Sequence, residues 1–389
     1  MKNSAVKEKF EMIAKTFHGL EAVLANEITA LGAENVEILN RAVRFYGDKA
    51  MLYHSNLYLR TALRILIPVI KTQINSQDEF YSCVREFEWE KYIKKGNTIA
   101  VDTFINSTVF THSHFVALRA KDAIADRFRE LFGRRPSVDT ENPDTLINVH
   151  LAGPELIISI DTSGASLHKR GYRISEVPAP VNEVLAAGLI LLTGWNGDSN
   201  FYDPMCGSGT IGIEAALIAR EIPPGVFRAK FGFENSPDFE QELWNEIFDN
   251  ISDKKWSGQV FASDISKGAL RITSENAKEA SVLKNISIKE IAFESFPQIA
   301  DGGIAILNPP YGKRIIKTDL NSFYQMIGDV MKKSFIGADV WVLSGNLESI
   351  SNIGLRPAIK HTLFNGAIEC RYNKYEIYSG SRKNKYENK

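Results

Sequence analysis

The motif NPPY, formed by Asn308, Pro309, Pro310 and Tyr311, directly follows the apolar residues 304–307. The apolar run predicts a buried strand, and two consecutive prolines must end it, because proline fixes φ and lacks a backbone N–H. At that turn the side-chain oxygen of Asn308 and the carbonyl of Pro309 are placed to accept both N–H bonds of an amine.

The chemistry that suits this corner is attack by the exocyclic amine of a nucleobase on an activated methyl group. Such an amine is a poor nucleophile because its lone pair is delocalised into the ring. Two acceptors would favour a pyramidal nitrogen whose lone pair points at the methyl group, and positioning of this kind lowers a reaction barrier. Tyr311 is expected to stack on the base, which must be unpaired or flipped out to reach the site. The alternative is an ordinary Pro-Pro turn with an Asn cap.

A glycine-containing loop, DPMCGSGT at residues 203–210, lies between a short apolar run and a helical one. Gly207 and Gly209 leave room for close approach of a ligand to the backbone, and a helix that begins near Thr210 offers free N–H groups. The loop lacks the Lys-Ser/Thr of a phosphate-binding P-loop, so ATP is not expected. A tight strand–helix turn without a ligand is the other interpretation.

The next predicted strand, residues 260–264, ends in an acid. An acid at the end of the second strand can bind both hydroxyls of a ribose. Asp264 lies about 60 residues after the loop, whereas a nicotinamide-dependent enzyme places this acid about 20 residues on. The extra length, residues 221–257, predicts an insertion with its own helix at 239–248. Asp264 could instead cap the helix that follows.

Strand-like and helical runs alternate from residue 166 onward, which predicts βαβ units and a mostly parallel sheet. The expected strands are residues 201–203, 260–264, 286–291, 304–308 and 340–344, and the expected helices are 182–192, 211–219, 267–280 and 323–335. Residues 359–364 and 368–378 follow each other without a helix and predict a terminal antiparallel hairpin. Residues 381–389 are polar and expected to form a tail.

Two smaller α+β units are predicted before this point, at residues 1–70 and 71–165. The first orders strand 11–17, helix 20–31, strands 36–39 and 42–46, helix 49–56 and strand 62–70, which is typical of a ferredoxin-like unit. The second has helices at 80–92 and 115–132, a strand at 98–105 and a hairpin of 146–151 with 155–160.

Basic residues gather on the predicted helix 115–132 and the turn after it. They are Arg119, Lys121, Arg127, Arg129, Arg134 and Arg135. Contacts with nucleic-acid phosphates would use such a cluster, although interleaved acids also fit a solvated helix face. Three further cations, Lys169, Arg170 and Arg173, either guide a substrate towards the NPPY corner or belong to a charged linker.

The bulk composition excludes several classes of protein. The 389 residues are 44% hydrophobic and carry a formal net charge of −1, so any basic footprint must be local. The three cysteines, Cys83, Cys206 and Cys370, form no CxxC pair, which predicts neither a zinc site nor a disulfide framework and fits a reducing cytoplasm. His112 and His114 are expected to be a surface pair rather than metal ligands. No secretory signal or membrane span is expected.

Several of these motifs resemble those of a known family. DPMCGSGT, the acid in ASDIS and NPPYG resemble motifs I, II and IV of class I S-adenosylmethionine-dependent methyltransferases that act on amino groups. The run LHKRGYR at 167–173, followed by APVNE at 179–183 and LAA at 185–187, is similar to the lead-in of the THUMP-containing RNA guanine-N2 methyltransferases, in particular those of 23S rRNA. The resemblance covers nearly the whole chain.

This resemblance implies a Rossmann-like α/β methyltransferase domain at residues 166–380, preceded by ferredoxin-like and THUMP units, with S-adenosylmethionine as cofactor and RNA as partner. Asp203, Gly207 and Gly209 would line the methionine part of the cofactor, and Asp264 would hold the ribose. Glu294 or Ser295 stands where the family often has an Asp that contacts the adenine. The full set of expected cofactor residues is Asp203, Pro204, Cys206, Gly207, Ser208, Gly209, Thr210, Asp264, Ile265 and Glu294.

The expected reaction is methylation of guanine N2 in RNA, most simply in 23S rRNA. NPPY by itself equally suits adenine N6 in DNA or RNA, and tRNA is a further substrate to consider. A THUMP protein that binds RNA without turnover is the non-enzymatic alternative, and the intact NPPY argues against it. A nicotinamide-dependent dehydrogenase is opposed by the late acid and by the NPPY.

Overall fold

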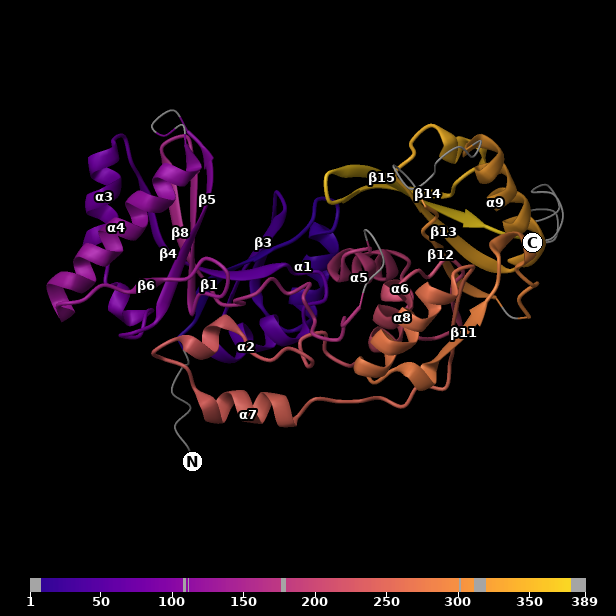
Figure 1. Cartoon of the computed structure of the whole chain (residues 1–389), viewed down its shortest axis with the longest axis horizontal. Helices are drawn as coiled ribbons and strands as arrows, with labels where there is room; N and C mark the ends of the chain where they lie inside the picture. Colours follow the sequence, from indigo (N-terminus) through magenta and orange to yellow (C-terminus); the bar gives the residue numbers. More distant parts are fainter. Residues whose placement is uncertain are drawn as a thin grey trace. The chain divides into compact units, whose positions relative to one another are not determined.

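The computed structural model describes residues 8–107, 110, 112–175, 180–300, 302–310 and 320–378. The chain forms two compact units, and both are assembled from separate segments. The N-terminal unit contains residues 1–16, 24–169 and 228–250. The second unit contains residues 17–23, 170–227 and 251–389, and is called the catalytic unit here because the glycine loop and the NPPY motif, for which chemistry was predicted, belong to it. Each unit is built around its own sheet (Figure 1).

The N-terminal unit contains one continuous sheet of eight strands in the order β2-β3-β1-β4-β8-β7-β5-β6. Its elements are β1 (Phe10–Lys15), α1 (Glu21–Ala30), β2 (Glu34–Leu39), β3 (Ala42–Gly47), α2 (Lys49–Tyr58), β4 (Arg64–Gln73), α3 (Gln77–Glu86), β5 (Thr98–Asn106), α4 (Ser113–Phe132), β6 (Ser137–Val138), β7 (Thr145–Ala152), β8 (Glu155–Asp161) and α7 (Gln241–Asp249). The two small units expected from the sequence therefore share a sheet. The long strand β4 joins them, because it pairs with β1 near its start and with β8 along its length.

The expected helix at 80–92 is wrong beyond residue 86. Ser76 caps the start of α3 by accepting a hydrogen bond from the Glu79 N–H, and Phe87 already has extended backbone angles. Trp89 is fully buried in a separate helical turn, and its indole N–H donates to the Val84 carbonyl at 2.6 Å. That tertiary contact ends the helix earlier than the apolar periodicity suggests.

The segment 228–250 was expected to belong with the catalytic domain but packs within the N-terminal unit. Tyr53 of α2 stacks on Phe233 with ring centroids 4.5 Å apart and meets Trp244 edge-on at 6.0 Å. The Tyr53 hydroxyl also accepts a hydrogen bond from the Glu240 N–H at 3.0 Å. Aromatic burial of this kind explains why residues 228–250 pack on α2 and not on the segments that flank them in the sequence.

The catalytic unit contains a seven-stranded sheet in the order β11-β10-β9-β12-β13-β15-β14. Its elements are α5 (Glu183–Leu192), β9 (Phe201–Asp203), α6 (Thr210–Ala219), β10 (Val260–Asp264), α8 (Lys267–Glu279), β11 (Ile286–Glu290), β12 (Gly303–Leu307), α9 (Leu320–Ser334), β13 (Ala338–Ser344), β14 (Ile359–Asn365) and β15 (Ile368–Glu376). The first five strands of this order are parallel, and β15 runs antiparallel to both β13 and β14. The expected parallel sheet and terminal hairpin are confirmed.

The helices of the catalytic unit lie on both sides of its sheet. Helices α5, α6 and α8 lie together, and α9 lies on the other side of β12 and β13 (Figure 1). Tyr324, Ile327 and Met331 of α9 are fully buried against Ala305 and Leu307 of β12. Strand β9 has β10 on one side and β12 on the other, so the strand order reverses there. Ligands of open α/β sheets bind at the carboxyl ends of the strands beside such a reversal.

Candidate active site and cofactor cavity

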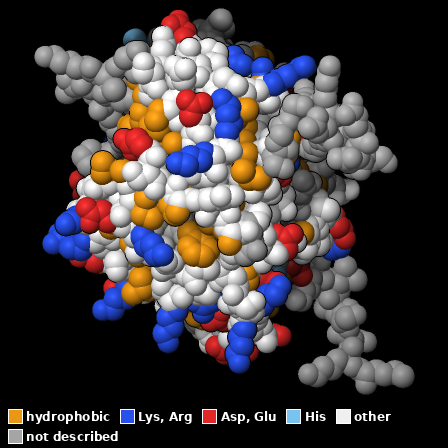
Figure 2. Space-filling model, turned by 90° about the vertical axis from the view of Figure 1, so that its right-hand side faces the viewer, with side chains coloured by type: hydrophobic (Ala, Val, Ile, Leu, Met, Phe, Trp, Pro, Cys, Tyr) orange, Lys and Arg blue, Asp and Glu red, His pale blue; other side chains and the backbone are white. Residues whose placement is uncertain are grey.

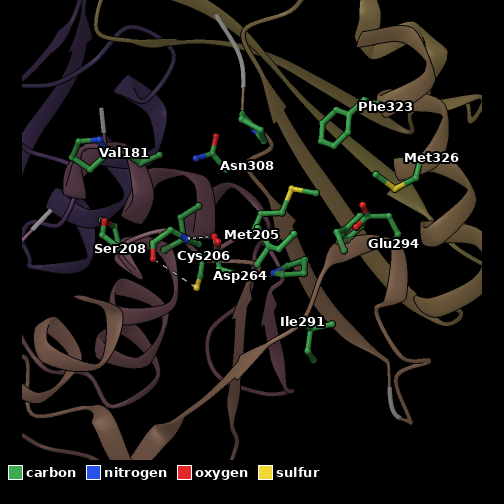
Figure 3. A pocket seen from close by; sticks show the side chains of 18 residues that line it. Val181, Met205, Cys206, Ser208, Asp264, Ile291, Glu294, Asn308, Phe323 and Met326 are labelled. Carbon is green, nitrogen blue, oxygen red and sulfur yellow. Dashed lines mark hydrogen bonds between the residues drawn. The ribbon is translucent and has the colours of Figure 1, made fainter. Parts of the chain in front are cut away.

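A cavity of about 350 Å³ lies at the carboxyl ends of β9, β10 and β12. In the close view, Val181 and Ser208 lie on one side of it, Glu294, Phe323 and Met326 on the other, and Asp264 and Met205 between them (Figure 3). The sequence-predicted residues that line this cavity are Pro204, Cys206, Gly207, Ser208, Thr210, Asp264, Ile265, Glu294, Asn308 and Pro310. The fold thus brings the three separate motifs to one place.

The glycine loop has a shape that depends on its two glycines. Gly207 and Gly209 have φ values of +56° and +79°, in the left-handed region that favours glycine. A Cβ at Gly209 would also lie 2.5 Å from the side chain of Thr273. Gly209 does not itself line the cavity; it is the N-cap residue of α6 and has no side chain to make a cap hydrogen bond, whereas Thr210 and Ile211 of the first turn line the cavity. The start of α6 therefore turns towards the cavity with the polarity that suits a ligand carboxylate.

Asp203 lies behind the loop rather than on the cavity wall, which differs from the expectation that it lines the methionine part of the cofactor. Its side chain is fully buried, and Oδ2 accepts a hydrogen bond from the Gly212 N–H at 3.1 Å. Burial, together with the nearby charge of Asp264, raises the pKa of Asp203 to about 7. The direct contact of Asp203 is thus with the first turn of α6.

Asp264 occupies the position expected of a ribose-binding acid. Its Oδ2 accepts a hydrogen bond from the Gly207 N–H at 3.0 Å, and its Oδ1 accepts one from the Ser266 N–H at 2.9 Å. Each carboxylate oxygen retains capacity for another donor, such as a ribose hydroxyl. The cap of α8 is Ser266, whose hydroxyl accepts from the Ala269 N–H. The alternative that Asp264 serves as the helix cap is therefore wrong.

Asn308 faces the same cavity from the end of β12 (Figure 3). Its Oδ1 is buried and has no hydrogen-bond partner among the residues that the structure describes. A buried acceptor without a donor costs free energy, so this atom is poised for a ligand N–H. Pro309 is buried and Pro310 is exposed. Tyr311, the last residue of the motif, lies outside the described residues.

The apolar walls of the cavity were not predicted from the sequence. They come from Val181, Ile291, Phe293, Phe323 and Met326, which lie far from the glycine loop along the chain. Ile265, one of the predicted residues, is 71% exposed and adds apolar surface beside Asp264. Apolar surface next to a carboxylate fits a nucleoside, whose base is apolar on its faces and whose ribose carries hydroxyls.

The remaining groups do not suggest metal or thiol chemistry. Burial raises the pKa of the Cys206 thiol well above its usual value, so the thiol stays uncharged and acts as a small apolar residue. Among the described parts of the chain, no group of three or more His, Cys, Asp and Glu side chains is arranged to hold a metal ion. Nor is any helix there both long enough and apolar enough to cross a bilayer.

The basic residues of α4 are mostly paired with acids. Their partners are Asp78 for Arg119 at 3.7 Å, Asp122 for Lys121 at 3.2 Å, Glu90 for Arg127 at 2.5 Å and Asp126 for Arg129 at 2.7 Å. Arg134 and Arg135, in the turn after α4, and Lys169 are exposed. The face in Figure 2 is the side drawn at the right of Figure 1, where α9 and β13 lie, and basic and acidic side chains are mixed on it. The α4 cations are thus paired with carboxylates on α4 itself and on residues 78 and 90, and their contact with RNA stays a prediction.

Arg170 and Arg173 do not lie on an RNA-accessible surface, contrary to expectation. The Arg170 side chain is 1% exposed, with Nε 3.5 Å from Oε1 of the fully buried Glu214. The Arg173 side chain is 14% exposed and donates to Glu183 at 2.7 Å. Both arginines pair with carboxylates inside the catalytic unit. Sequence spacing alone could not reveal these pairs, because Glu214 lies 44 residues after Arg170 and Glu183 lies 10 residues after Arg173.

Each of the three regions of the chain matches a known protein family. Residues 170–374 match the family described as RMKL-like, methyltransferase domain. Residues 11–66 match the RlmL ferredoxin-like domain, and residues 75–161 match the THUMP domain. These matches confirm the expected kinds of domain in the expected order.

Individual relatives extend the likeness over nearly the whole chain. The protein slr0064 of Synechocystis sp., assigned as an RNA methyltransferase, is 37% identical, with 94% of this chain and 96% of that protein covered. The ribosomal RNA large subunit methyltransferase K/L of Syntrophotalea carbinolica is 36% identical over 92% of this chain, which spans only 52% of that longer protein. The structure of the methyltransferase SMU.472 with bound SAH has a TM-score of 0.86 at 28% identity, covering 97% of this chain and 100% of the other.

Proposed function

Because the chain belongs to the RMKL-like methyltransferases, whose cofactor is S-adenosylmethionine, we propose that it methylates the N2 amine of a guanine in RNA, specifically in 23S rRNA. The observation that carries this proposal is the buried Oδ1 of Asn308, which has no hydrogen-bond partner among the described residues and lies on the wall of the cavity that Asp264 also lines. An amine N–H is the donor that this atom lacks.

The residue types that line the cavity suit the chemical groups of S-adenosylmethionine. Asp264 would accept hydrogen bonds from the ribose, the loop around Gly207 would hold the amino-acid arm, and Ile265 would cover one face of the adenine. The bound cofactor supplies a methyl group on a positively charged sulfur. The other roles in the reaction fall to residues of this chain.

Asn308 Oδ1 and the Pro309 carbonyl would hold the two N–H groups of the target amine, so that the nitrogen lone pair is directed at the methyl carbon. The target nitrogen held in this way would gain the N–C bond, with the carbon–sulfur bonding pair retained by the cofactor as a neutral thioether. The nitrogen then loses one proton to solvent, since neither the Asn308 amide nor a carbonyl is basic enough to keep it. Preorganised acceptors are effective here because they need no rearrangement during the reaction.

The choice of substrate rests on the relatives and on the resemblance of residues 167–187 to guanine-N2 enzymes. The K/L relatives are named for the RNA of the large ribosomal subunit. The chain spans about half of the length of these K/L relatives and 96% of slr0064. The matched THUMP domain supports RNA over DNA as the substrate.

The test uses 23S rRNA from a strain that lacks this protein, incubated with the purified chain and S-adenosylmethionine labelled in the methyl group. After nuclease digestion, the label is expected in N2-methylguanosine. Total tRNA from the same strain serves as the competing substrate. Label found only in N6-methyladenosine would reject the guanine assignment, and label found only in tRNA would reject the rRNA assignment.

A further inference from the structure

The linker at residues 171–175, just before α5, is held against the glycine loop by two side chains that the predicted site did not include as cofactor residues. These are Arg173 in the linker and Asn276 on α8. Pro180 and Val181, further along the same stretch of chain, line the cofactor cavity. The attachments of this linker therefore bear on the shape of the cavity.

Arg173 connects three structural elements around the start of α6. Its Nη2 donates to the Val181 carbonyl and to the Thr210 hydroxyl, each at 2.9 Å. Its Nε donates to Glu183, the first residue of α5, at 2.7 Å. Two of these partners, Val181 and Thr210, are residues of the cavity wall.

Asn276 makes the second attachment. It is 1% exposed, and its Oδ1 accepts from the Ile174 and Ser175 N–H groups at 3.1 and 3.4 Å. Its Nδ2 donates to the Ser175 carbonyl at 3.0 Å and to the Ser208 carbonyl at 3.3 Å. These four contacts use the full hydrogen-bonding capacity of an amide side chain, and they join the linker directly to the glycine loop.

The linker has little freedom to sit elsewhere. Gly171 has φ of +107°, and a Cβ at this position would lie 2.1 Å from the Phe227 carbonyl oxygen. The buried Tyr172 donates its hydroxyl to Glu214 of α6 at 2.9 Å. Successive residues of the linker are therefore fixed against α6, the glycine loop and the chain that leaves α6.

We infer that Arg173 and Asn276 are positioning residues for the cofactor, which hold the linker, the glycine loop and the start of α6 in the geometry that binds S-adenosylmethionine. They act through Ser208, Val181 and Thr210 and not through RNA. The inference rests on the cofactor of the family, and not on which base is methylated.

The test is calorimetric binding of S-adenosylhomocysteine to the full chain without RNA. Arg173→Lys keeps the charge beside Glu183 but loses the second branch of the guanidinium, which contacts Val181 and Thr210. Asn276→Asp keeps the shape but places a carboxylate against two carbonyl oxygens. Each variant is expected to raise the Kd about tenfold, the effect of losing one charge-assisted or fully buried hydrogen bond. The KM for S-adenosylmethionine should rise similarly, with kcat at saturation changed less than about threefold.

Lys169→Ala is the matched control, since Lys169 is an exposed cation at the edge of the same stretch. It should leave S-adenosylhomocysteine binding unchanged. Filter binding of a 23S rRNA transcript should give the same affinity and salt dependence for Arg173→Lys and for the unsubstituted chain. Weaker RNA binding with unchanged S-adenosylhomocysteine affinity would assign Arg173 to RNA and overturn the inference. A lower melting temperature with unchanged affinity in both variants, or failure of both to fold, would show a purely structural role and would also overturn it.

Discussion

The cofactor cavity of the catalytic unit and the cationic helix α4 of the N-terminal unit were both predicted as functional from residue types, yet they are organised in opposite ways. In the cavity, residues from three separate motifs line one space, and Asn308 has an acceptor there that no residue of the described parts of the chain satisfies. On α4, the cations lie between Arg119 and Arg129 and are paired individually with Asp or Glu.

This difference indicates which of the two regions contributes more free energy to ligand binding per residue. A buried, unpaired polar atom is costly unless a ligand satisfies it, so its retention at a cavity wall is strong evidence for a ligand. An exposed ion pair contributes little to stability and is screened by salt. Single substitutions in the cavity should therefore have large effects, and single substitutions on α4 should have small ones.

The largest effect is expected for Asn308→Ala. Removing the acceptor leaves the amine unpositioned, and kcat should fall by about 100- to 1,000-fold, the range seen when a preorganised hydrogen-bonding group is lost. The affinity for S-adenosylhomocysteine should stay within a few-fold, because the proposed role of Asn308 is to hold the target amine and not the cofactor. Single-turnover rates and calorimetry measure the two quantities. Equal losses in both would contradict the role assigned to Asn308.

Asp264→Ala should weaken S-adenosylhomocysteine binding about 100-fold, since two hydrogen bonds from the ribose to a carboxylate would be lost. Asp264→Asn is the control, because it keeps one acceptor oxygen and should lose less. If the two variants bound S-adenosylhomocysteine as tightly as the unsubstituted chain, the ribose would have to be held elsewhere.

The double variant Arg134→Ala/Arg135→Ala should weaken binding of a 23S rRNA transcript about tenfold near 0.1 M salt. The slope of log affinity against log salt should become shallower by about 1.5, as expected when two phosphate contacts are removed. The matched control, Arg119→Ala/Arg129→Ala on the paired face of α4, should change the affinity less than about twofold. The reverse ranking would mean that the paired cations exchange their acidic partners for phosphates.

The smallest effect is a pH-dependent change in stability from Asp203→Asn. The pKa of Asp203 is raised to about 7 in the folded protein, so the folded state binds a proton that the unfolded state releases from about pH 4 upward. The charge of Asp203 therefore costs stability progressively between pH 4 and 7, and the full cost is present above pH 7. Because Asn carries no charge, Asp203→Asn should melt a few degrees higher at pH 8 and gain less at pH 5. Parallel melting curves across this range would show that Asp203 does not titrate as described.

Much of the catalytic unit follows from local sequence. Strands β9 and β10 begin and end at the predicted residues. Strands β14 and β15 form the hairpin that was predicted because no helical run separates them in the sequence. Apolar runs, glycines and prolines act over a few residues, so they define strands and loops wherever the chain folds. The placement of Asn308, Gly207 and Asp264 at one edge of the sheet follows in turn, because all three stand at the carboxyl ends of parallel strands.

Other features depended on contacts between residues distant in sequence. The apolar face of Phe323 and Met326, the burial of Arg170 against Glu214, and the packing of Trp244 on Tyr53 have no signature in the local pattern. The sequence around an arginine does not show whether its side chain binds a phosphate at the surface or a buried carboxylate. Sequence by itself determined the chemistry available at the strand ends. Tertiary structure alone decided which charges were neutralised inside the protein and which stayed exposed, because pairing depends on which surfaces the fold brings together and removes from water.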